Sequence, residues 1–326
     1  MELIDKMNGV LDDLSLKARC VAAEQNGHLA FFDLQTSRVS AIESFSREIA
    51  MGLRSKKSPI ITTIPRLGIV RLRVAMGDAE VIPFDDIYNN STPIKGTLPF
   101  LFGRDDEGNP LWVDMAKNPH MLIAGTTGSG KSTLLHVIIA NALKRHDVEL
   151  TLIDPKFGVE FARYSDTIHV AKEYSDALAE LELIQSEMEY RYRLMFKNKV
   201  FSIDQDPNIF KKKLVVIDEI ADLLLKDNSK SNPEKGKFED ILCNIAQKAR
   251  ACGIYMVIAT QRPSIDIITG SIKANFPARV ACKVSTATDS KVILDQVGAE
   301  SLLGRGDAII NSVTHNYIRF QSAYVG

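Results

Sequence analysis

From about residue 97 onward, the sequence alternates short apolar runs with segments of helical periodicity. The apolar runs include HMLIAG, LTLID, KLVVID and GIYMVIAT, and they lack the alternation of a strand with one face in solvent. Between them, residues 175–197 carry one apolar face, formed by Leu178, Leu181, Ile184, Met188, Tyr192 and Met195. This pattern predicts an α/β fold with a mainly parallel sheet that helices cover on both faces.

Residues 1–95 have a different texture and predict a small α/β domain. FFDL is typical of a strand end, and residues 69–74 alternate apolar side chains with arginines. Helical spacing is found for Ala41, Ile42, Phe45, Ile49, Ala50 and Leu53. The stretch NNSTPIKGT suits a linker, and FLFGRDDEGNPLWVDM predicts a hairpin turning at 105–109. We therefore expect two domains, at 1–95 and 96–326.

The charge balance limits how the chain could bind a polyanion. Its 326 residues include 40 basic and 41 acidic side chains, so only a local patch could hold nucleic acid. The acidic start does not fit a signal peptide, and stretches such as LLHVIIANAL fall short of the ~18–20 residues that span a bilayer. We expect a cytoplasmic protein without membrane insertion.

Three groups of residues are not assigned to a catalytic or metal site. The four cysteines form no C-x-x-C pair and the histidines are scattered, which favours reduced cysteines over a zinc site. The stretch KDNSKSNPEKGK, at 226–237, predicts a mobile polar loop. The lysines at 56–57 and 211–213 are interpreted as solvated edges.

The sequence GTTGSGKS, at 125–132, fits the pattern G-x-x-x-x-G-K-[ST] between a predicted strand and a helix predicted over 131–144. In such a loop backbone N–H groups face phosphate oxygens, Lys131 can reach the β and γ phosphates, and the Ser132 hydroxyl can bind Mg²⁺. The alternative is a glycine-rich turn without a ligand. The residues expected to bind the nucleotide are Gly125, Thr126, Thr127, Gly128, Ser129, Gly130, Lys131, Ser132 and Thr133.

Two acids directly follow the apolar run at 214–217. At the end of a buried strand, Asp218 is expected to hold the Mg²⁺ shell together with Ser132, and Glu219 to polarise the attacking water of a hydrolase. A solvated acidic turn is the alternative. Gln261 follows another apolar run and could sense a γ-phosphate or be an ordinary loop residue, since the spacing leaves both possibilities open.

Several longer stretches resemble the motor domain of the FtsK/SpoIIIE family of DNA translocases. They are AGTTGSGKS, IDPK, EMEYRYRLM, VVIDEIADLL, IAQKARACGI, ATQRPSIDIITGSIKANFPARVA and DSKVILDQVGAESLLGRGDAII. Together they cover the second predicted domain, and the long stretch from 259 to 281 is far more specific than the phosphate loop alone. The resemblance implies a RecA-like P-loop NTPase core that forms a hexameric ring around double-stranded DNA and moves it by ATP hydrolysis.

The resemblance also implies roles for residues outside the phosphate loop. It implies an arginine finger at Arg250, a sensor at Gln261, and DNA contacts at Arg262, Lys273 and Lys291. Many family members have a further lysine where this chain has Ala287. Independently, an apolar helical stripe turns Arg250 away from the core, which suits either a finger or a solvated residue near a helix end. That stripe consists of Phe238, Ile241, Leu242, Ile245, Ala249 and Cys252.

The resemblance also includes part of the first predicted domain. Two functions other than DNA translocation remain as alternatives. Residues 20–95 resemble a shortened form of the family's small α domain, and the chain ends where the motor domain ends, so neither a membrane segment nor a winged-helix domain is expected. One alternative is a type VII secretion-like ATPase that acts on polypeptides. Another is a nucleotide-gated binding protein without turnover, which the presence of both Glu219 and Arg250 disfavours.

Overall fold

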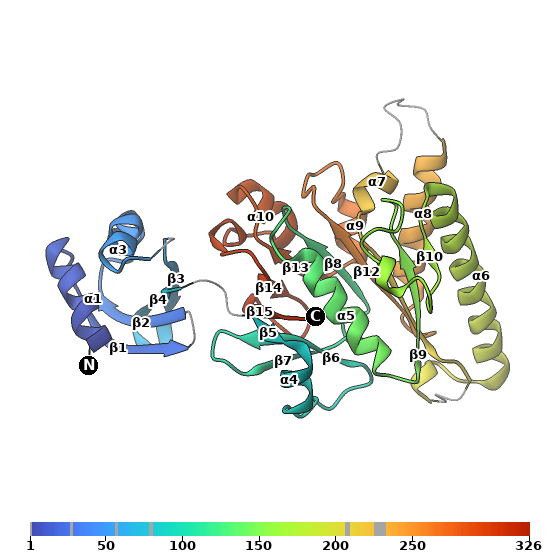
Figure 1. The fold of residues 1–326 in the computed structure, drawn as a ribbon, viewed down its shortest axis with the longest axis horizontal. Helices are drawn as coiled ribbons and strands as arrows, with labels where there is room; N and C mark the ends of the chain where they lie inside the picture. Colours follow the sequence, from blue (N-terminus) through green and yellow to red (C-terminus); the bar gives the residue numbers. More distant parts are fainter. Residues whose placement is uncertain (1, 27–28, 56–57, 78–80, 206–208, 225–232) are drawn as a thin grey trace.

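The chain folds around two β-sheets, a small one near the N-terminus and a large one that contains the phosphate loop (Figure 1). The computed structural model describes residues 2–26, 29–55, 58–77, 81–205, 209–224 and 233–326.

The small sheet is antiparallel, with strand order β1-β2-β4-β3. Its core contains Phe32, Leu34, Leu72 and Val74, which alternate with more exposed residues along two neighbouring strands. The strands predicted at FFDL and 69–74 are confirmed as β2 and β4, and the predicted helical stretch divides at Phe45 into two short helices. The elements are α1 (Glu2–Asp13), β1 (Ala18–Asn26), β2 (Leu29–Thr36), α2 (Val39–Ser44), α3 (Ser46–Gly52), β3 (Ile60–Ile64) and β4 (Ile69–Ala75).

The large sheet has the order β10-β9-β11-β12-β8-β13-β14-β15-β6-β7, with β5 beside β15. The first six strands are parallel and the next four pair antiparallel, so the predicted mainly parallel sheet is confirmed. Its strands are β5 (Ile82–Pro83), β6 (Pro99–Asp105), β7 (Pro110–Asp114), β8 (His120–Ala124), β9 (Val148–Ile153), β10 (Val170–Ala171), β11 (Lys212–Ile217), β12 (Ile254–Thr260), β13 (Ala278–Cys282), β14 (Asp307–Asn311) and β15 (Ile318–Tyr324).

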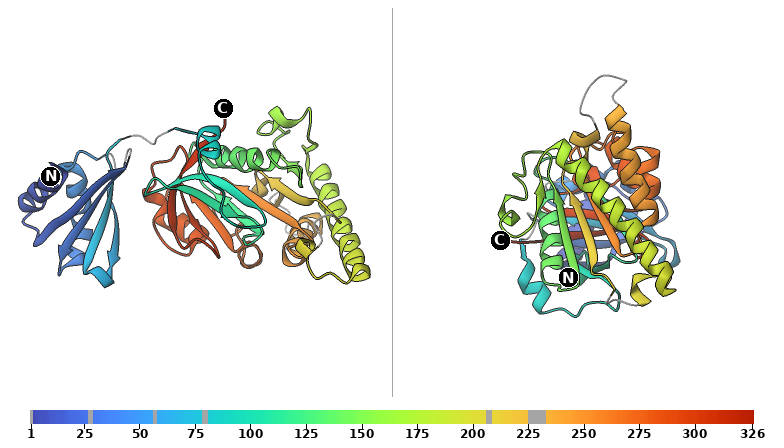
Figure 2. Two further views of the ribbon diagram at one scale, coloured as in Figure 1. Left: turned by 90° about the horizontal axis from the view of Figure 1, so that it is seen from below. Right: turned by 90° about the vertical axis from the view of Figure 1, so that its right-hand side faces the viewer.

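Helices cover both faces of the parallel part of this sheet (Figure 2). On β8, Leu122 packs in the core shared with α6 and α8, whereas Ile123 packs in the core shared with α5. Burial of both faces explains why the strands are apolar throughout. The helices are α4 (Phe84–Asn89), α5 (Lys131–Leu143), α6 (Tyr174–Asn198), α7 (Ile220–Leu224), α8 (Pro233–Lys248), α9 (Gly270–Asn275) and α10 (Ala287–Leu294).

The hairpin expected within 100–115 is confirmed and is formed by β6 and β7. Its turn closes through the N–H of Gly108, which donates to the carbonyl of Asp105 at 3.0 Å. Ahead of it, Ile82, Phe84 and Ile87 are buried beside Trp112 and Ala323 of the large sheet. Residues 82–87 therefore pack against the large sheet, and the boundary at 95–96 stays a prediction.

Two expectations about the region after β11 need correction. Residues 226–232 of the expected polar loop lie outside the described residues, but residues 233–237 begin α8. The described part of this helix runs from Pro233 to Lys248. The helical stripe expected to reach Cys252 ends with α8 at Lys248, so Ala249, Arg250 and Cys252 lie in the turn that leads to β12.

The two sheets are connected by a contact between β4 and the β6–β7 turn. Arg73 forms an ion pair with Asp106 at 2.5 Å, and burial raises the pKa of Asp106 to about 6. Among the described helices, none is both long and apolar enough to cross a membrane.

His120 begins strand β8 and is buried without a hydrogen-bond partner for either ring nitrogen among the described residues. Its ring meets the edge of Phe276 at a centroid distance of 5.9 Å. Burial, with a smaller contribution from Arg250, lowers the pKa of His120 to about 3. The folded protein therefore holds this imidazole neutral at pH values where an exposed histidine is protonated.

This burial predicts a pH dependence of stability. Between pH values of about 6.5 and 3 the unfolded chain binds one more proton at His120 than the folded chain, so stability falls on acidification. When the pH falls from about 7 to about 4.5, the free energy of unfolding should decrease in both proteins. The decrease should be about 2–3 kcal/mol smaller in His120→Leu than in the unsubstituted protein. Urea unfolding followed by Trp112 emission measures this difference. The exposed His146→Leu is the control, and equal losses in both variants would contradict the prediction.

Candidate nucleotide site

The strand order brings the carboxyl ends of three strands together at one edge of the large sheet. Strand β12 lies between β8 and β11. Gly125 follows β8, Asp218 follows β11 and Gln261 follows β12. The three polar stretches singled out in the sequence therefore meet at the edge where open α/β sheets bind ligands.

The phosphate loop is fixed by backbone contacts to two other loops. The N–H of Thr126 donates to the carbonyl of Lys283 at 3.0 Å, and the N–H of Gly306 donates to the carbonyl of Ser129 at 2.9 Å. Gly130 has φ +103°, and a Cβ there would lie 2.1 Å from the nitrogen of Gly306. Only glycine fits this close approach of two backbones.

Lys131 and Asp218 form a buried ion pair across the site, with side chains 3% and 2% exposed. The carboxylate of Asp218 and the hydroxyl of Ser132, which lines the pocket with Lys131, offer oxygen ligands, the type that Mg²⁺ prefers. The donor set thus fits Mg²⁺, which these two residues would hold.

Both carboxylate oxygens of Glu219 are engaged. Oε1 accepts a hydrogen bond from the Thr260 hydroxyl at 2.7 Å, and Oε2 accepts one from the N–H of Gln261 at 3.0 Å. Lys156 lies 3.5 Å from Oε2 as an ion-pair partner. These contacts hold the buried carboxylate beside the end of β12 and give it a defined orientation.

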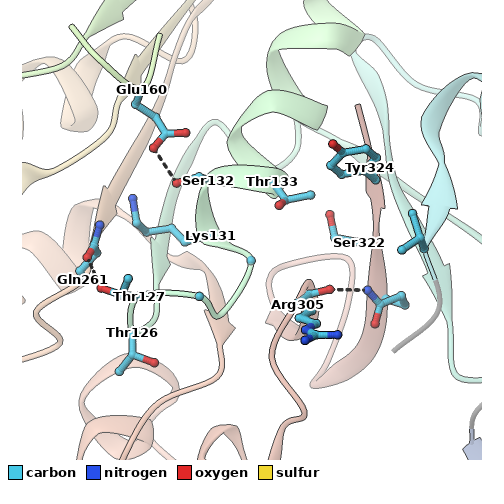
Figure 3. Close-up of a pocket in the computed structure, with 14 residues that line it drawn as sticks. Thr126, Thr127, Lys131, Ser132, Thr133, Glu160, Gln261, Arg305, Ser322 and Tyr324 are labelled. Carbon is cyan, nitrogen blue, oxygen red and sulfur yellow. Dashed lines mark hydrogen bonds between the residues drawn. The ribbon is translucent and has the colours of Figure 1, made fainter. Parts of the chain in front are cut away.

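Gln261 connects the phosphate loop with Glu219. Its Oε1 accepts a hydrogen bond from the Thr127 hydroxyl at 2.8 Å (Figure 3). Its backbone N–H donates to Glu219. A single residue therefore connects the phosphate loop with Glu219 through hydrogen bonds.

Glu160 is a pocket residue that sequence reasoning missed. Its carboxylate accepts a hydrogen bond from the Ser132 hydroxyl at 2.9 Å and lies 3.1 Å from His136 Nε2. The hydrogen bond with His136 holds the pKa of Glu160 below its ordinary value. The stretch IDPK lies just before it, but the sequence between the two contains no pattern that marks Glu160.

The pocket of about 480 Å³ extends from the phosphate loop toward the C-terminal strand. Figure 3 shows Tyr324, Ser322 and Arg305 across the pocket from Glu160 and Gln261. An aromatic ring, the aliphatic Val81 and polar groups at this end suit the base and sugar of a nucleotide, whereas the phosphate loop suits its phosphates.

Arg250 lies at the opposite edge of the sheet from the phosphate loop. It precedes β12, whereas Gln261 follows it, and seven residues at about 3.3 Å each separate the two edges by about 23 Å. Arg250 is exposed and lines a cavity with Asp204, Lys117 and Tyr255. It therefore cannot complete the nucleotide site of its own chain.

The three residues implied in DNA contact differ in their environment. Arg262 is exposed in the loop after β12, and Lys291 is exposed on α10. Lys273 on α9 is half-buried and forms an ion pair with Asp295 at 2.6 Å. Asp295 also pairs with Arg279, so it is shared between two basic side chains.

Known proteins match the chain over most of its length. The profile of the FtsK/SpoIIIE family matches residues 90–214 and 206–265. The DNA translocase FtsK of Clostridium acetobutylicum is 34% identical over 343 residues, which cover 98% of this chain and 44% of that protein. The DNA translocase SftA of Bacillus subtilis is 35% identical over 337 residues, which cover 97% of this chain and 35% of that protein. The chain thus spans less than half the length of either relative.

Solved structures share the fold. The pCW3 conjugation coupling protein TcpA, in its monomer form with ATPγS, superposes with a TM-score of 0.72 at 24% identity and covers 100% of this chain and 96% of its own. The cytoplasmic domain of the type VII secretion ATPase EccC of Thermomonospora curvata has a TM-score of 0.64 at 21% identity, covering 76% of this chain and 32% of its own. These matches confirm the expected RecA-like P-loop fold.

The close approach of the two backbones predicts different outcomes for two glycines of the phosphate loop. Gly130→Ala adds a clash to a left-handed φ and should destabilise the protein by about 2–5 kcal/mol and abolish nucleotide binding. Gly128→Ala, with φ +75° and nothing within 4 Å of the new Cβ, should cost only about 1–2 kcal/mol. Urea unfolding and titration with a fluorescent ATP analogue measure both effects. Equal losses of stability would show that the contact with Gly306 is unimportant.

Proposed function

Since the chain belongs to the FtsK/SpoIIIE family, we propose that it hydrolyses ATP to move double-stranded DNA, working as a hexameric homo-oligomeric ring. Its similarity to proteins named DNA translocases supports this substrate. The proposal assigns ATP and Mg²⁺ to the pocket at the carboxyl edge of the sheet and DNA to a channel formed by several subunits.

The arrangement around Glu219 carries the proposal for ATP hydrolysis. The carboxylate is buried, oriented by Thr260 and Gln261, and set beside the strand end that also holds Asp218. In this role Glu219 accepts the proton of the water that attacks the γ-phosphate, a function that a phosphate-binding protein would not need. Lys131 stabilises the phosphate charge, and Mg²⁺, held by Ser132 and Asp218, would supply further positive charge to the phosphates.

The position of Arg250 supports catalysis across a subunit boundary. Because it lies at the amino edge of the sheet, it can stabilise phosphate charge only in the site of another copy. If the amino edge of one copy faces the carboxyl edge of the next copy, the two copies meet through different surfaces. Repeating such a heterologous contact can close a ring. Each site would then need its neighbour for turnover.

DNA contact is assigned to Arg262, Lys273 and Lys291. Contacts to phosphate oxygens suit a motor that moves along any sequence, because they carry no base readout. Arg262 and Lys291 are exposed. Lys273 would have to exchange its ion pair with Asp295 for a phosphate, so its contribution should be the smallest of the three.

ATPase activity with and without long double-stranded DNA, measured across a salt series, tests the proposed function. DNA should stimulate turnover severalfold at low salt, and stimulation should fade as salt rises. Arg262→Ala should weaken stimulation by DNA. It should also reduce the slope of log affinity for DNA against log salt concentration by about 1, the value for one phosphate contact. Lys197→Ala, at an exposed position on α6, should change neither. Glu219→Gln serves as the blank that binds ATP without hydrolysing it. An oligomeric protein that DNA does not stimulate would favour the polypeptide-export function instead.

A mixing experiment tests the role of Arg250. Arg250→Ala and Lys131→Ala should each hydrolyse ATP at least about tenfold more slowly than the unsubstituted protein. Mixed oligomers should regain part of the activity, because an intact Lys131 site can receive Arg250 from a Lys131→Ala neighbour. Mixing Arg250→Ala with Glu219→Gln is a second test with the same expectation. Folded variants that assemble but show no rescue in either mixture would contradict action across subunits.

A further inference from the structure

The residues after β9 form a short segment, 154–160, that is organised by one buried carboxylate. Asp154 is fully buried and accepts hydrogen bonds from the N–H groups of Lys156 at 3.0 Å and Glu160 at 2.8 Å. Burial raises the pKa of Asp154 above its ordinary value. These bonds turn the segment back toward the pocket and direct Glu160 at the start of α5 (Figure 3).

Glu160 bridges two residues that lie one helical turn apart on α5. Oε2 accepts from the Ser132 hydroxyl at 2.9 Å, and Oε1 lies 3.1 Å from His136 Nε2. The other nitrogen of His136 is 2.9 Å from the Tyr164 hydroxyl, which limits rotation of the imidazole ring. Residues at i and i+4 share one helix face, so one carboxylate can contact both.

The hydrogen bond from Ser132 to Glu160 determines the direction of the lone pairs on the Ser132 hydroxyl. A serine hydroxyl has one hydrogen and two lone pairs, and donating the hydrogen to Glu160 leaves the lone pairs for other partners. Asp218, the acid expected to hold Mg²⁺ together with this hydroxyl, is paired with Lys131 in the structure. Glu160 is therefore the acid that orients Ser132.

We propose that Glu160 is a positioning residue for the metal of the nucleotide site, which turns the Ser132 oxygen toward Mg²⁺ while His136 holds the carboxylate in place. This inference rests on the proposed function, since it assumes that MgATP binds at the phosphate loop. Residues that hydrogen-bond to metal ligands fix the orientation of those ligands, and their substitution commonly weakens metal affinity by about 10–100-fold. Glu160 itself need not touch the metal.

A role limited to packing makes a different prediction. If Glu160 only joined the 154–160 segment to α5, its removal would weaken nucleotide binding equally with and without Mg²⁺. A positioning role instead changes the Mg²⁺ concentration that tight nucleotide binding requires. The two roles are therefore separated by binding alone, without measuring hydrolysis.

The test uses the full chain and a fluorescent ATP analogue, titrated at increasing Mg²⁺ and in EDTA. Glu160→Ala should raise the Mg²⁺ concentration for half-maximal binding about tenfold or more, with little change of affinity in EDTA. Glu160→Gln should show a smaller shift, because its amide oxygen can still accept from Ser132. Asp166→Ala, which removes an exposed acid outside the pocket, should behave like the unsubstituted protein. Trp112 emission verifies folding, and Glu160→Gln remains informative if Glu160→Ala does not fold.

Three outcomes would overturn the assignment. Equal weakening with Mg²⁺ and in EDTA would indicate a packing role, and an unchanged Mg²⁺ requirement in both Glu160 variants would leave Ser132 oriented by another group. Either result would leave the proposed nucleotide site intact. Failure of the unsubstituted protein to bind the analogue at any Mg²⁺ concentration would instead overturn the proposed function together with the role of Glu160.

Discussion

The buried ion pair between Lys131 and Asp218 joins two halves of the site that come from strands separated by β12. Both side chains are almost completely shielded from water, so each charge depends on the other for compensation. The pair can exist only because β12 holds β8 and β11 in parallel register and ends at the same edge. The order of three strands thus determines where Glu219, Gln261 and Ser132 lie relative to one another.

The same strands separate the nucleotide pocket from Arg250. A parallel strand has two chemically different ends, and in this chain the proposed nucleotide site lies at one end and the exposed Arg250 at the other. The turn between α8 and β12 fixes Arg250 through Ala249, which is buried, and through the backbone bond from Ile203 to Ala251. Arg250 is therefore held by the core of its own subunit, even though the proposed target of its side chain is in another subunit.

Local patterns predicted much of the fold and the centre of the site. The phosphate loop, the acids after β11 and the apolar stripe of α8 were identifiable because each lies in one continuous stretch with its own periodicity or spacing. Strands β14 and β15 were not predicted, because their antiparallel pairing joins segments without a distinctive local pattern. Glu160, Thr260 and Gly306 were missed for a related reason. Their roles arise from contacts with residues far away in the sequence, and Lys273 likewise has a partner, Asp295, that only the fold reveals.

The path of β15 has a practical consequence for handling the protein. This strand ends at Tyr324, which lines the nucleotide pocket, and Arg163 donates a hydrogen bond to the carbonyl of Gly326 at 2.6 Å. An affinity tag or fluorescent fusion attached after Gly326 would therefore begin only two residues beyond a side chain that lines the pocket. Residue 2 begins α1, next to the small sheet and on the far side of the molecule from this pocket (Figure 1). A purification handle belongs at that end of the chain.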